Sequence, residues 1–270
     1  MSIKTLFLLL FFTLTLGAYE RIISLSPSIT EIVYALQKGD DLVATSAFSL
    51  YPKEAQNLPV IGGYSNPNLE KIIALSPTLV IGQDFNHATL EKLKRFKIET
   101  LMLKLQTIND IKSSITELAE RLHVNSKEVI KSIEYAIKNA PKSKKPHRVM
   151  IVYGLHEDLR SGIYIAGNDI FFDDIITLCG NTNAYNANQT NQPVLSYENV
   201  IALNPDRIII LHSDASNSSV DKEKALSAWH SLPTNASKNR RITVVDESYI
   251  HIPSHRVALT IERLCREMNR

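Results

Sequence analysis

The residues that could carry out catalysis are scattered through this 270-residue chain, and no familiar catalytic pattern joins them. The sequence has no G-x-S-x-G nucleophile turn, no Walker loop, no H-E-x-x-H pair and no C-x-x-C motif. His212, Ser213 and Asp214 are the residue types of a hydrolase triad, but neighbours in sequence rarely reach the required geometry. They leave an α/β hydrolase as an alternative function.

Metal ligation by the histidines is a second alternative. His251 and His255 are the closest pair among eight scattered histidines, and Pro253 between them disfavours a helical metal-binding pair. A site that combines His212 or His251 with carboxylates would suit a bare first-row transition-metal ion. A receptor for such an ion therefore remains an alternative, and no residue is assigned to a metal directly.

Binding of a flat ligand is the chemistry that the polar and aromatic residues favour most. They follow the carboxyl ends of predicted strands, where α/β sheets bind ligands. Aromatic side chains with an occasional arginine suit a flat ligand that is partly apolar and partly anionic. The candidate ligand-binding residues are Ser26, Phe48, Tyr51, Tyr64, Phe85, Arg160, His212, Tyr249, His251 and Arg256. For Arg256, a solvent-facing place at the start of a helix is the alternative.

The elements that must position these residues alternate between strands and helices. We expect strands at residues 21–25, 42–45, 79–81, 99–103, 148–153, 207–211 and 241–245. Amphipathic helices are expected between them, the first capped by Ser28 or Thr30. The asparagine-rich stretch 181–192 is expected to be a loop. This alternation predicts an α/β fold with mainly parallel, doubly wound sheets covered on both faces.

Residues 108–140 lack a strand signal and carry apolar residues at helical spacing, with a break near Val124. We expect the second helix of this segment, at about 126–139, to connect two lobes stiffly. The predicted organisation is a signal peptide at 1–18, an N-terminal α/β lobe at 19–107, a helical segment with the linker helix at 108–145 and a C-terminal α/β lobe at 146–270.

A helix-to-strand unit occurs once in each half of the chain. Glu70 begins Glu-Lys-Ile-Ile-Ala-Leu-Ser-Pro, and Glu198 begins Glu-Asn-Val-Ile-Ala-Leu-Asn-Pro. Two similar halves imply two similar lobes with a cleft between them, which is a preferred place for ligands. The local explanation of the two acids is that each favours the positive end of its helix by about 0.3–1 kcal/mol.

The beginning of the chain predicts export. Lys4 precedes an apolar run at 6–16, too short for a membrane span, and the small residues Gly17 and Ala18 suit a cleavage site. In an oxidising compartment the only two cysteines, Cys179 and Cys265, suggest a disulfide, with two buried free thiols as the alternative.

The net charge of +2 indicates no particular partner. We interpret the locally basic stretch 142–148 as a solvated linker, since no aromatic platform for nucleic acid accompanies it.

Several segments together resemble the class III periplasmic substrate-binding proteins of ABC importers for vitamin B12, ferric siderophores and haem. The resemblance spans essentially the whole mature chain and is strongest over residues 21–82. Its motifs are Arg-Ile-Ile-Ser-Leu-Ser-Pro-Ser-Ile-Thr-Glu-Ile-Val-Tyr-Ala-Leu at 21–36, Tyr-Pro-Lys-Glu-Ala at 51–55, Pro-Val-Ile-Gly-Gly-Tyr at 59–64 and Asn-Leu-Glu-Lys-Ile-Ile-Ala-Leu-Ser-Pro at 68–77.

The resemblance implies a non-enzymatic receptor with two lobes joined by one long rigid helix and a ligand cleft between them. It implies that Glu70 and Glu198 dock onto the permease dimer of the inner membrane, and that Cys179 and Cys265 pair as in the vitamin B12 binders. Those binders use tryptophans in the cleft, where this chain has Tyr64, and the sole Trp229 lies elsewhere. We therefore expect a monomeric periplasmic receptor for a metal chelate that contains iron or cobalt, with no intrinsic cofactor and no nucleic-acid partner.

Overall fold

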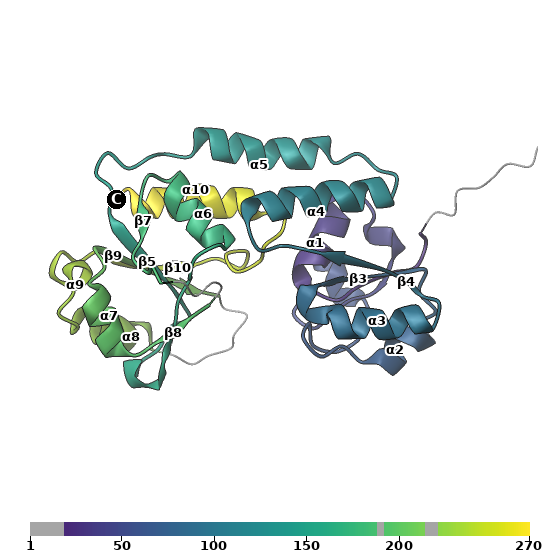
Figure 1. Cartoon of the computed structure of the whole chain (residues 1–270), viewed down its shortest axis with the longest axis horizontal. Helices are drawn as coiled ribbons and strands as arrows, with labels where there is room; N and C mark the ends of the chain where they lie inside the picture. The colour runs from purple at the N-terminus through teal and green to yellow at the C-terminus, as the bar shows by residue number, and fades with distance from the viewer. Residues whose placement is uncertain (1–18, 188–191, 214–220) are drawn as a thin grey trace, which may run out of the picture.

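The computed structural model describes residues 19–187, 192–213 and 221–270, and the expected signal peptide lies outside them. Each half of the chain forms a lobe around a four-stranded parallel sheet (Figure 1). The predicted α/β class with two lobes is therefore confirmed. Among the described residues, no helix is both long enough and apolar enough to cross a bilayer.

The N-terminal lobe has the strand order β2-β1-β3-β4. Its elements are β1 (Ile22–Ser24), α1 (Pro27–Ala35), β2 (Leu42–Ala44), α2 (Leu69–Ala74), β3 (Leu79–Gln83), α3 (His87–Arg95) and β4 (Glu99–Leu103). Helix α1 begins after Ser26, whose hydroxyl accepts a hydrogen bond from the amide of Ile29, and Pro27 follows in the first turn. The cap predicted at Ser28 or Thr30 is wrong because the helix begins earlier, at Pro27. Proline suits this first position because it has no N–H group, and an N–H there would have no partner within the helix.

The C-terminal lobe has the strand order β10-β9-β5-β7 and a small antiparallel pair, β6 with β8. Its elements are β5 (Arg148–Tyr153), β6 (Ile163–Tyr164), α6 (Phe171–Leu178), β7 (Thr182–Asn183), β8 (Val194–Leu195), α7 (Tyr197–Leu203), β9 (Arg207–His212), α8 (Lys222–His230), α9 (Asn235–Lys238), β10 (Ile242–Asp246) and α10 (Val257–Met268). Strand β7 corrects the expectation of a loop throughout 181–192: its two residues pair with Arg148 and Val149 of β5 despite their polar side chains.

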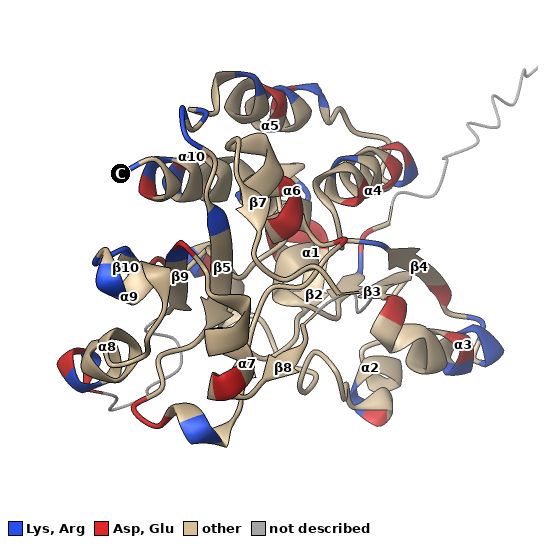
Figure 2. Ribbon diagram, turned by 60° about the vertical axis from the view of Figure 1, so that its left-hand side comes forward, with Lys and Arg blue, Asp and Glu red and all other residues tan. Residues whose placement is uncertain are grey.

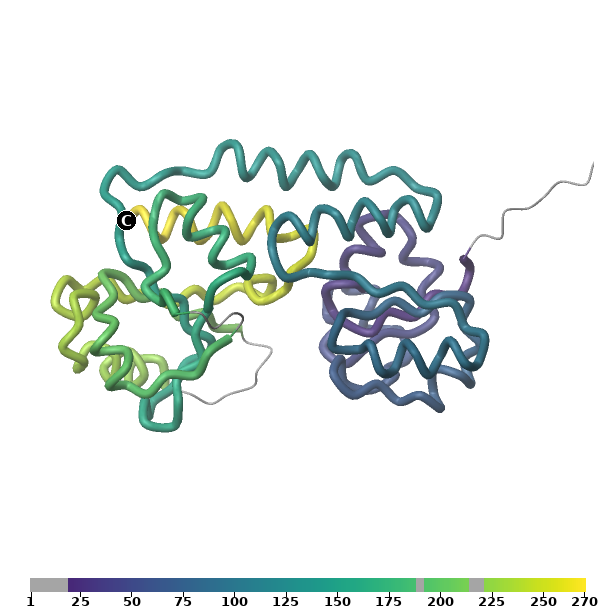
Figure 3. Tube along the Cα trace, in the orientation of Figure 1, coloured from purple at the N-terminus to yellow at the C-terminus, as the bar shows by residue number. Residues whose placement is uncertain are grey.

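Helices α4 (Ile108–Arg121) and α5 (Lys127–Asn139) connect the lobes, with the break between them near Val124 as predicted. Helix α5 packs against α4 and against α10 of the C-terminal lobe, and Figure 3 shows the traces of α5 and α10 running alongside each other. One apolar cluster extends through both lobes and includes Ile22, Ile111, Ile151 and Leu264. The other face of each sheet is covered by a separate apolar cluster, one in the C-terminal lobe and one in the N-terminal lobe. The lobes therefore share part of their core.

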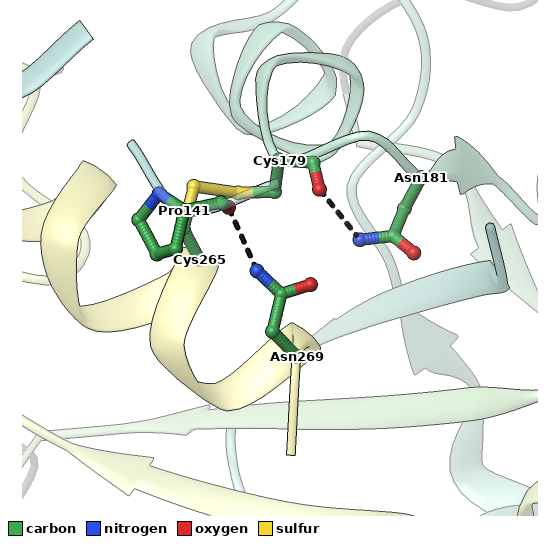
Figure 4. The surroundings of a disulfide bond; sticks show 5 residues. All are labelled: Pro141, Cys179, Asn181, Cys265 and Asn269. Atoms are coloured by element: carbon green, nitrogen blue, oxygen red, sulfur yellow. Dashed lines mark hydrogen bonds between the residues drawn. A yellow bond between two sulfur atoms is a disulfide. The ribbon is translucent and has the colours of Figure 1, made fainter. Parts of the chain in front are cut away.

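The predicted disulfide between Cys179 and Cys265 is present (Figure 4). It joins the residue that ends α6 to the last turns of α10, with both cysteines fully buried. The alternative of two free thiols is therefore wrong for this structure. A cross-link over 86 residues of sequence ties the last helix to the middle of the C-terminal lobe.

Candidate functional site

Four exposed aromatic side chains gather on loops of the N-terminal lobe. Phe48 and Tyr51 follow β2, Tyr64 lies between β2 and α2, and Phe85 follows β3. Their exposed fractions are 65, 45, 48 and 49%, which is high for large rings. The loops after β2 and β3 leave the carboxyl edge of the parallel sheet, as the sequence predicted, so the lobe presents apolar rings where α/β folds bind ligands.

Buried asparagine Asn86 holds two of these loops together. Its side-chain amide donates to the carbonyl of Tyr64 at 2.7 Å, and its Oδ1 accepts from the amide of Gln83 at 2.9 Å. The rings of Tyr64 and Phe85 consequently meet edge to face, with centroids 5.8 Å apart. Sequence reasoning missed Asn86, and the only available signal was its place three residues after the end of β3.

A buried network of hydroxyl groups supports the loop that carries Phe48 and Tyr51. Thr45 Oγ1 donates to Ser49 Oγ at 2.8 Å and also meets Ser24 and Thr30. These four residues are almost completely buried, so the network fixes both ends of the turn. Phe48 lies between them with φ of 66°, a left-handed conformation that is uncommon for a bulky residue. Such strained positions cluster at functional sites.

Arg256 contacts residues of both lobes. Its Nε donates to Glu31 Oε2 at 2.9 Å, and its Nη2 donates to Glu31 Oε1. The guanidinium carbon lies 4.0 Å from the ring centroid of Tyr51 and 5.6 Å from that of Tyr249. Arg256 is only 8% exposed, so the solvent-facing alternative is wrong. Sequence reasoning missed Glu31, which lies inside an apolar helix face.

The chain thus brings Tyr51, Tyr249 and Arg256 together although they are far apart in sequence. Ser254 completes the arrangement because its hydroxyl donates to the same Glu31 carboxylate. Burial raises the pKa of Glu31, against the opposing effects of Arg256 and Ser254. The charge pair therefore bears a substantial desolvation cost, and it fixes the position of one lobe against the other at this point.

Histidine and tyrosine side chains lie at the carboxyl edge of the C-terminal sheet. His251 stacks on Tyr153, with ring centroids 5.8 Å apart. Burial, with a smaller effect of the nearby His212, lowers the pKa of His251 to about 4. Burial also raises the pKa of Tyr153. Both rings are therefore neutral at pH 7, and His212 lies near enough to His251 to affect its pKa.

Two other predicted ligand residues have local partners. Ser26 is 1% exposed and accepts a hydrogen bond from Gln83 Nε2 at 2.8 Å in addition to capping α1. Arg160 is exposed and donates to both carboxylate oxygens of Asp158 at 2.9 and 3.0 Å. The carboxylate of Asp158 raises the pKa of Arg160, so this predicted ligand residue is engaged by a neighbour two positions away.

The alternative chemistries find little support. Within residues 19–187, 192–213 and 221–270, no group of three or more histidine, cysteine, aspartate or glutamate residues could hold a metal ion. Of the three residues of the hydrolase alternative, Asp214 lies outside the described residues. His212 is the last residue of β9, and Ser213 follows it directly.

Glu70 and Glu198 occupy the same position in two equivalent helices. Each is the second residue of its helix, α2 or α7, and each is exposed. The caps also match, because Asn68 accepts from the amide three residues later at 2.9 Å and Ser196 does so at 3.3 Å. Both helices lie at the side of the molecule away from α5, and Figure 2 shows acidic residues on each.

The fold and these surfaces define a two-lobed α/β binding protein. The chain belongs to the periplasmic binding protein family, whose model matches residues 22–249. A vitamin B12-binding protein of Vibrio vulnificus strain CMCP6 is 30% identical over 272 residues, which cover 96% of this chain and 94% of the relative. This membership confirms the predicted family and the expectation of a binding protein in place of an enzyme.

Two solved structures resemble the chain over nearly its whole length. The periplasmic heme-binding protein RhuT from Roseiflexus sp. RS-1, in its apo form, has a TM-score of 0.78 and 26% identity over 94% of this chain and 98% of that one. A possible iron-binding periplasmic solute-binding protein from Staphylococcus epidermidis ATCC 12228 has a TM-score of 0.75 and 26% identity over 94% of this chain and 100% of that one. Both carry the same two-lobed fold.

Proposed function

We propose that the protein captures a metal chelate between its two lobes in the periplasm and delivers it to an ABC permease dimer of the inner membrane. The chelate classes are those of the family: a corrinoid, haem or a ferric siderophore, so that the transported ligand contains iron or cobalt. The protein acts as a monomer without a cofactor of its own. Its signal peptide is cleaved near Ala18.

One observation carries the proposal: four exposed aromatic rings lie on the loops of one lobe, and an arginine of the other lobe contacts one of them. Tyr51 belongs to both groups, because it is 45% exposed and lies under the Arg256 guanidinium. Exposed rings favour the face of a flat, partly apolar ligand. Arg256 contributes by contacting the ring of Tyr51, since Glu31 engages its donors and offsets its charge.

Among flat chelates, a tetrapyrrole-type macrocycle suits the relatives best. Several relatives by sequence are vitamin B12-binding proteins, and a structural relative is a heme-binding protein. Trp229 does not take part in this site because it is fully buried in the C-terminal core. Tyrosine and phenylalanine therefore have to provide the contacts that other receptors obtain from tryptophan.

Titration of the mature protein with cyanocobalamin, haemin and a ferric siderophore tests the proposal. One of them should bind at a 1:1 ratio, and Tyr51→Ala or Tyr64→Ala should each weaken binding by roughly tenfold or more, as expected for the loss of a ring contact of about 1.5 kcal/mol. Tyr135→Ala is the matched control, because Tyr135 is 67% exposed on α5. Equal affinity in all three variants would contradict the site.

Docking to the permease is tested separately. The paired position of Glu70 and Glu198 on two similar lobes suits a partner with two similar basic sites, and such charges mainly set register and association rate. The double variant Glu70→Ala with Glu198→Ala should bind the ligand normally but support little uptake. The control is Glu117→Ala with Glu120→Ala, two exposed acids of α4. Normal uptake by the first variant would favour the helix-dipole explanation.

A further inference from the structure

A pocket of about 390 Å³ lies at the amino-terminal edge of the C-terminal sheet, away from the aromatic rings. It is bounded by the segment between α5 and β5, by the first residue of β9 and by the end of α10. Strands β5 and β9 have six residues each, so roughly 20 Å of sheet separates this pocket from the carboxyl edge. It is therefore distinct from the chelate site.

The pocket has a strongly basic lining. Its charged residues are Lys142, Lys144, Lys145, Arg207 and Arg270, joined by His147, and none of its described lining residues is acidic. Figure 2 shows basic residues where the chain leaves α5 and at the end of α10. Burial and the charges of Arg241 and Arg207 lower the pKa of His147, which is the expected effect of a positive local field.

Arg207 is the residue that sets this pocket apart. It is 4% exposed, and its Nε has no hydrogen-bond partner among the described residues. Burial and the neighbouring Arg241 lower the pKa of Arg207, and the opposing effect of Glu267 is smaller. The carboxylate of Glu267 is already engaged by Arg263 and Arg270. A guanidinium stays charged in proteins, so burying one whose Nε has no hydrogen-bond partner is costly.

The pocket wall is held in place by the surroundings of the disulfide. Asn269 Nδ2 donates to the carbonyl of Pro141 at 2.7 Å, as Figure 4 shows. The amide of Ser143 donates to the carbonyl of Cys179 at 2.8 Å, and the amide of His147 donates to Asn181 Oδ1 at 3.0 Å. The segment with the lysines is thus fastened to the ends of α6 and α10 and is more than the solvated linker that the sequence indicated.

We propose that this pocket binds a phosphate-bearing anion with two or more negative charges, which pairs with Arg207. A guanidinium whose Nε has no partner can donate to a phosphate oxygen, and the surrounding lysines supply further charge. The volume exceeds that of a single phosphate group and suits a ligand with more than one anionic group. Such a group can belong to a soluble molecule or to the headgroup of an anionic lipid.

Thermal unfolding of the mature protein at low ionic strength tests this site. Inorganic pyrophosphate should raise the unfolding temperature, because a ligand that binds only the folded state stabilises it. Sodium chloride at matched ionic strength should not. Vesicles that contain cardiolipin, whose headgroup carries two phosphates, form the second arm: stabilisation or co-sedimentation with vesicles, but no response to pyrophosphate, assigns the phosphate to a lipid headgroup. No response in either arm would overturn the proposal.

Variants separate specific binding from general charge. Arg207→Met should weaken pyrophosphate binding by roughly tenfold to a hundredfold, the expected loss for a charge-assisted hydrogen bond. Without the anion it should be at least as stable as the unaltered protein, because an unpaired buried charge has been removed. Lys144→Met, at an exposed position of the lining, should weaken binding severalfold. Lys127→Met, an exposed charge of α5 outside the pocket, is the control. Equal affinity in all three variants would contradict the site.

Discussion

The charge pair of Glu31 and Arg256 makes a quantitative prediction about how the lobes are held together. The two residues are 225 positions apart, and their side chains are 3 and 9% exposed. Removing one partner of a buried pair leaves the other charge unpaired, which destabilises proteins by about 3–5 kcal/mol. Arg256→Met and Glu31→Met should each lower the free energy of unfolding by about that amount.

The double variant should behave differently from the sum of the single ones. Burial raises the pKa of Glu31 even though Arg256 and Ser254 favour its charged form, so the desolvation cost of the pair consumes much of its attraction. Replacing both charges by methionine removes that cost and the attraction together, and such exchanges are often neutral. We expect the double variant to lose less stability than either single variant, which corresponds to a coupling energy of about 3 kcal/mol or more.

Urea unfolding followed by two signals measures this cycle. Trp229 is the sole tryptophan and lies in the C-terminal core, so its fluorescence reports that lobe, whereas far-UV circular dichroism reports both. The shared apolar cluster predicts coincident transitions in the unaltered protein. A loss below about 1 kcal/mol in Arg256→Met, or strictly additive losses in the double variant, would refute a buried pair that couples the lobes.

Three further predictions concern stability. Burial lowers the pKa values of His251 and His255 to about 4. Their contribution to stability is therefore complete above their unfolded pKa of about 6.5 and is lost as the pH falls towards 4, which lowers the free energy of unfolding by about 3 kcal/mol for each histidine. His251→Gln should flatten the measured dependence of the free energy of unfolding on pH. A profile unchanged by that substitution would contradict the assignment. Cys179→Ala with Cys265→Ala should cost about 4–5 kcal/mol in urea unfolding, and a loss under 1 kcal/mol would contradict the cross-link. Phe48→Gly should relieve backbone strain without loss of stability while weakening ligand binding, and the reverse pattern would make Phe48 structural.

The fold could be predicted because the sequence patterns that determine it are local. Short β-branched runs such as 207–211 were long enough to identify the main strands. Asn125 with Glu128 resembles a capping box and indicated the break near Val124. Strand β7 was missed because its two residues are polar and depend on pairing with β5 for their conformation. Two-residue strands carry no periodic signal of their own.

The candidate site could be predicted only in part because its contacts are between distant residues. Rings at strand ends were recognisable, since the carboxyl edge of a parallel sheet collects them. Glu31 was not, because an acid within a helix gives no sign that Ser254 and Arg256 will approach it from the other lobe. The buried cation Arg207 was missed for the same reason: its surroundings come from three segments that are distant in sequence.

Native mass spectrometry of the protein isolated from its own periplasm tests the central claim most directly. The account predicts one metal chelate per chain, identified by its mass and isotope pattern, which is retained in Tyr135→Ala and depleted in Tyr64→Ala. Protein that carries no chelate, and that also fails to bind cyanocobalamin, haemin or a ferric siderophore when these are added, would contradict the account.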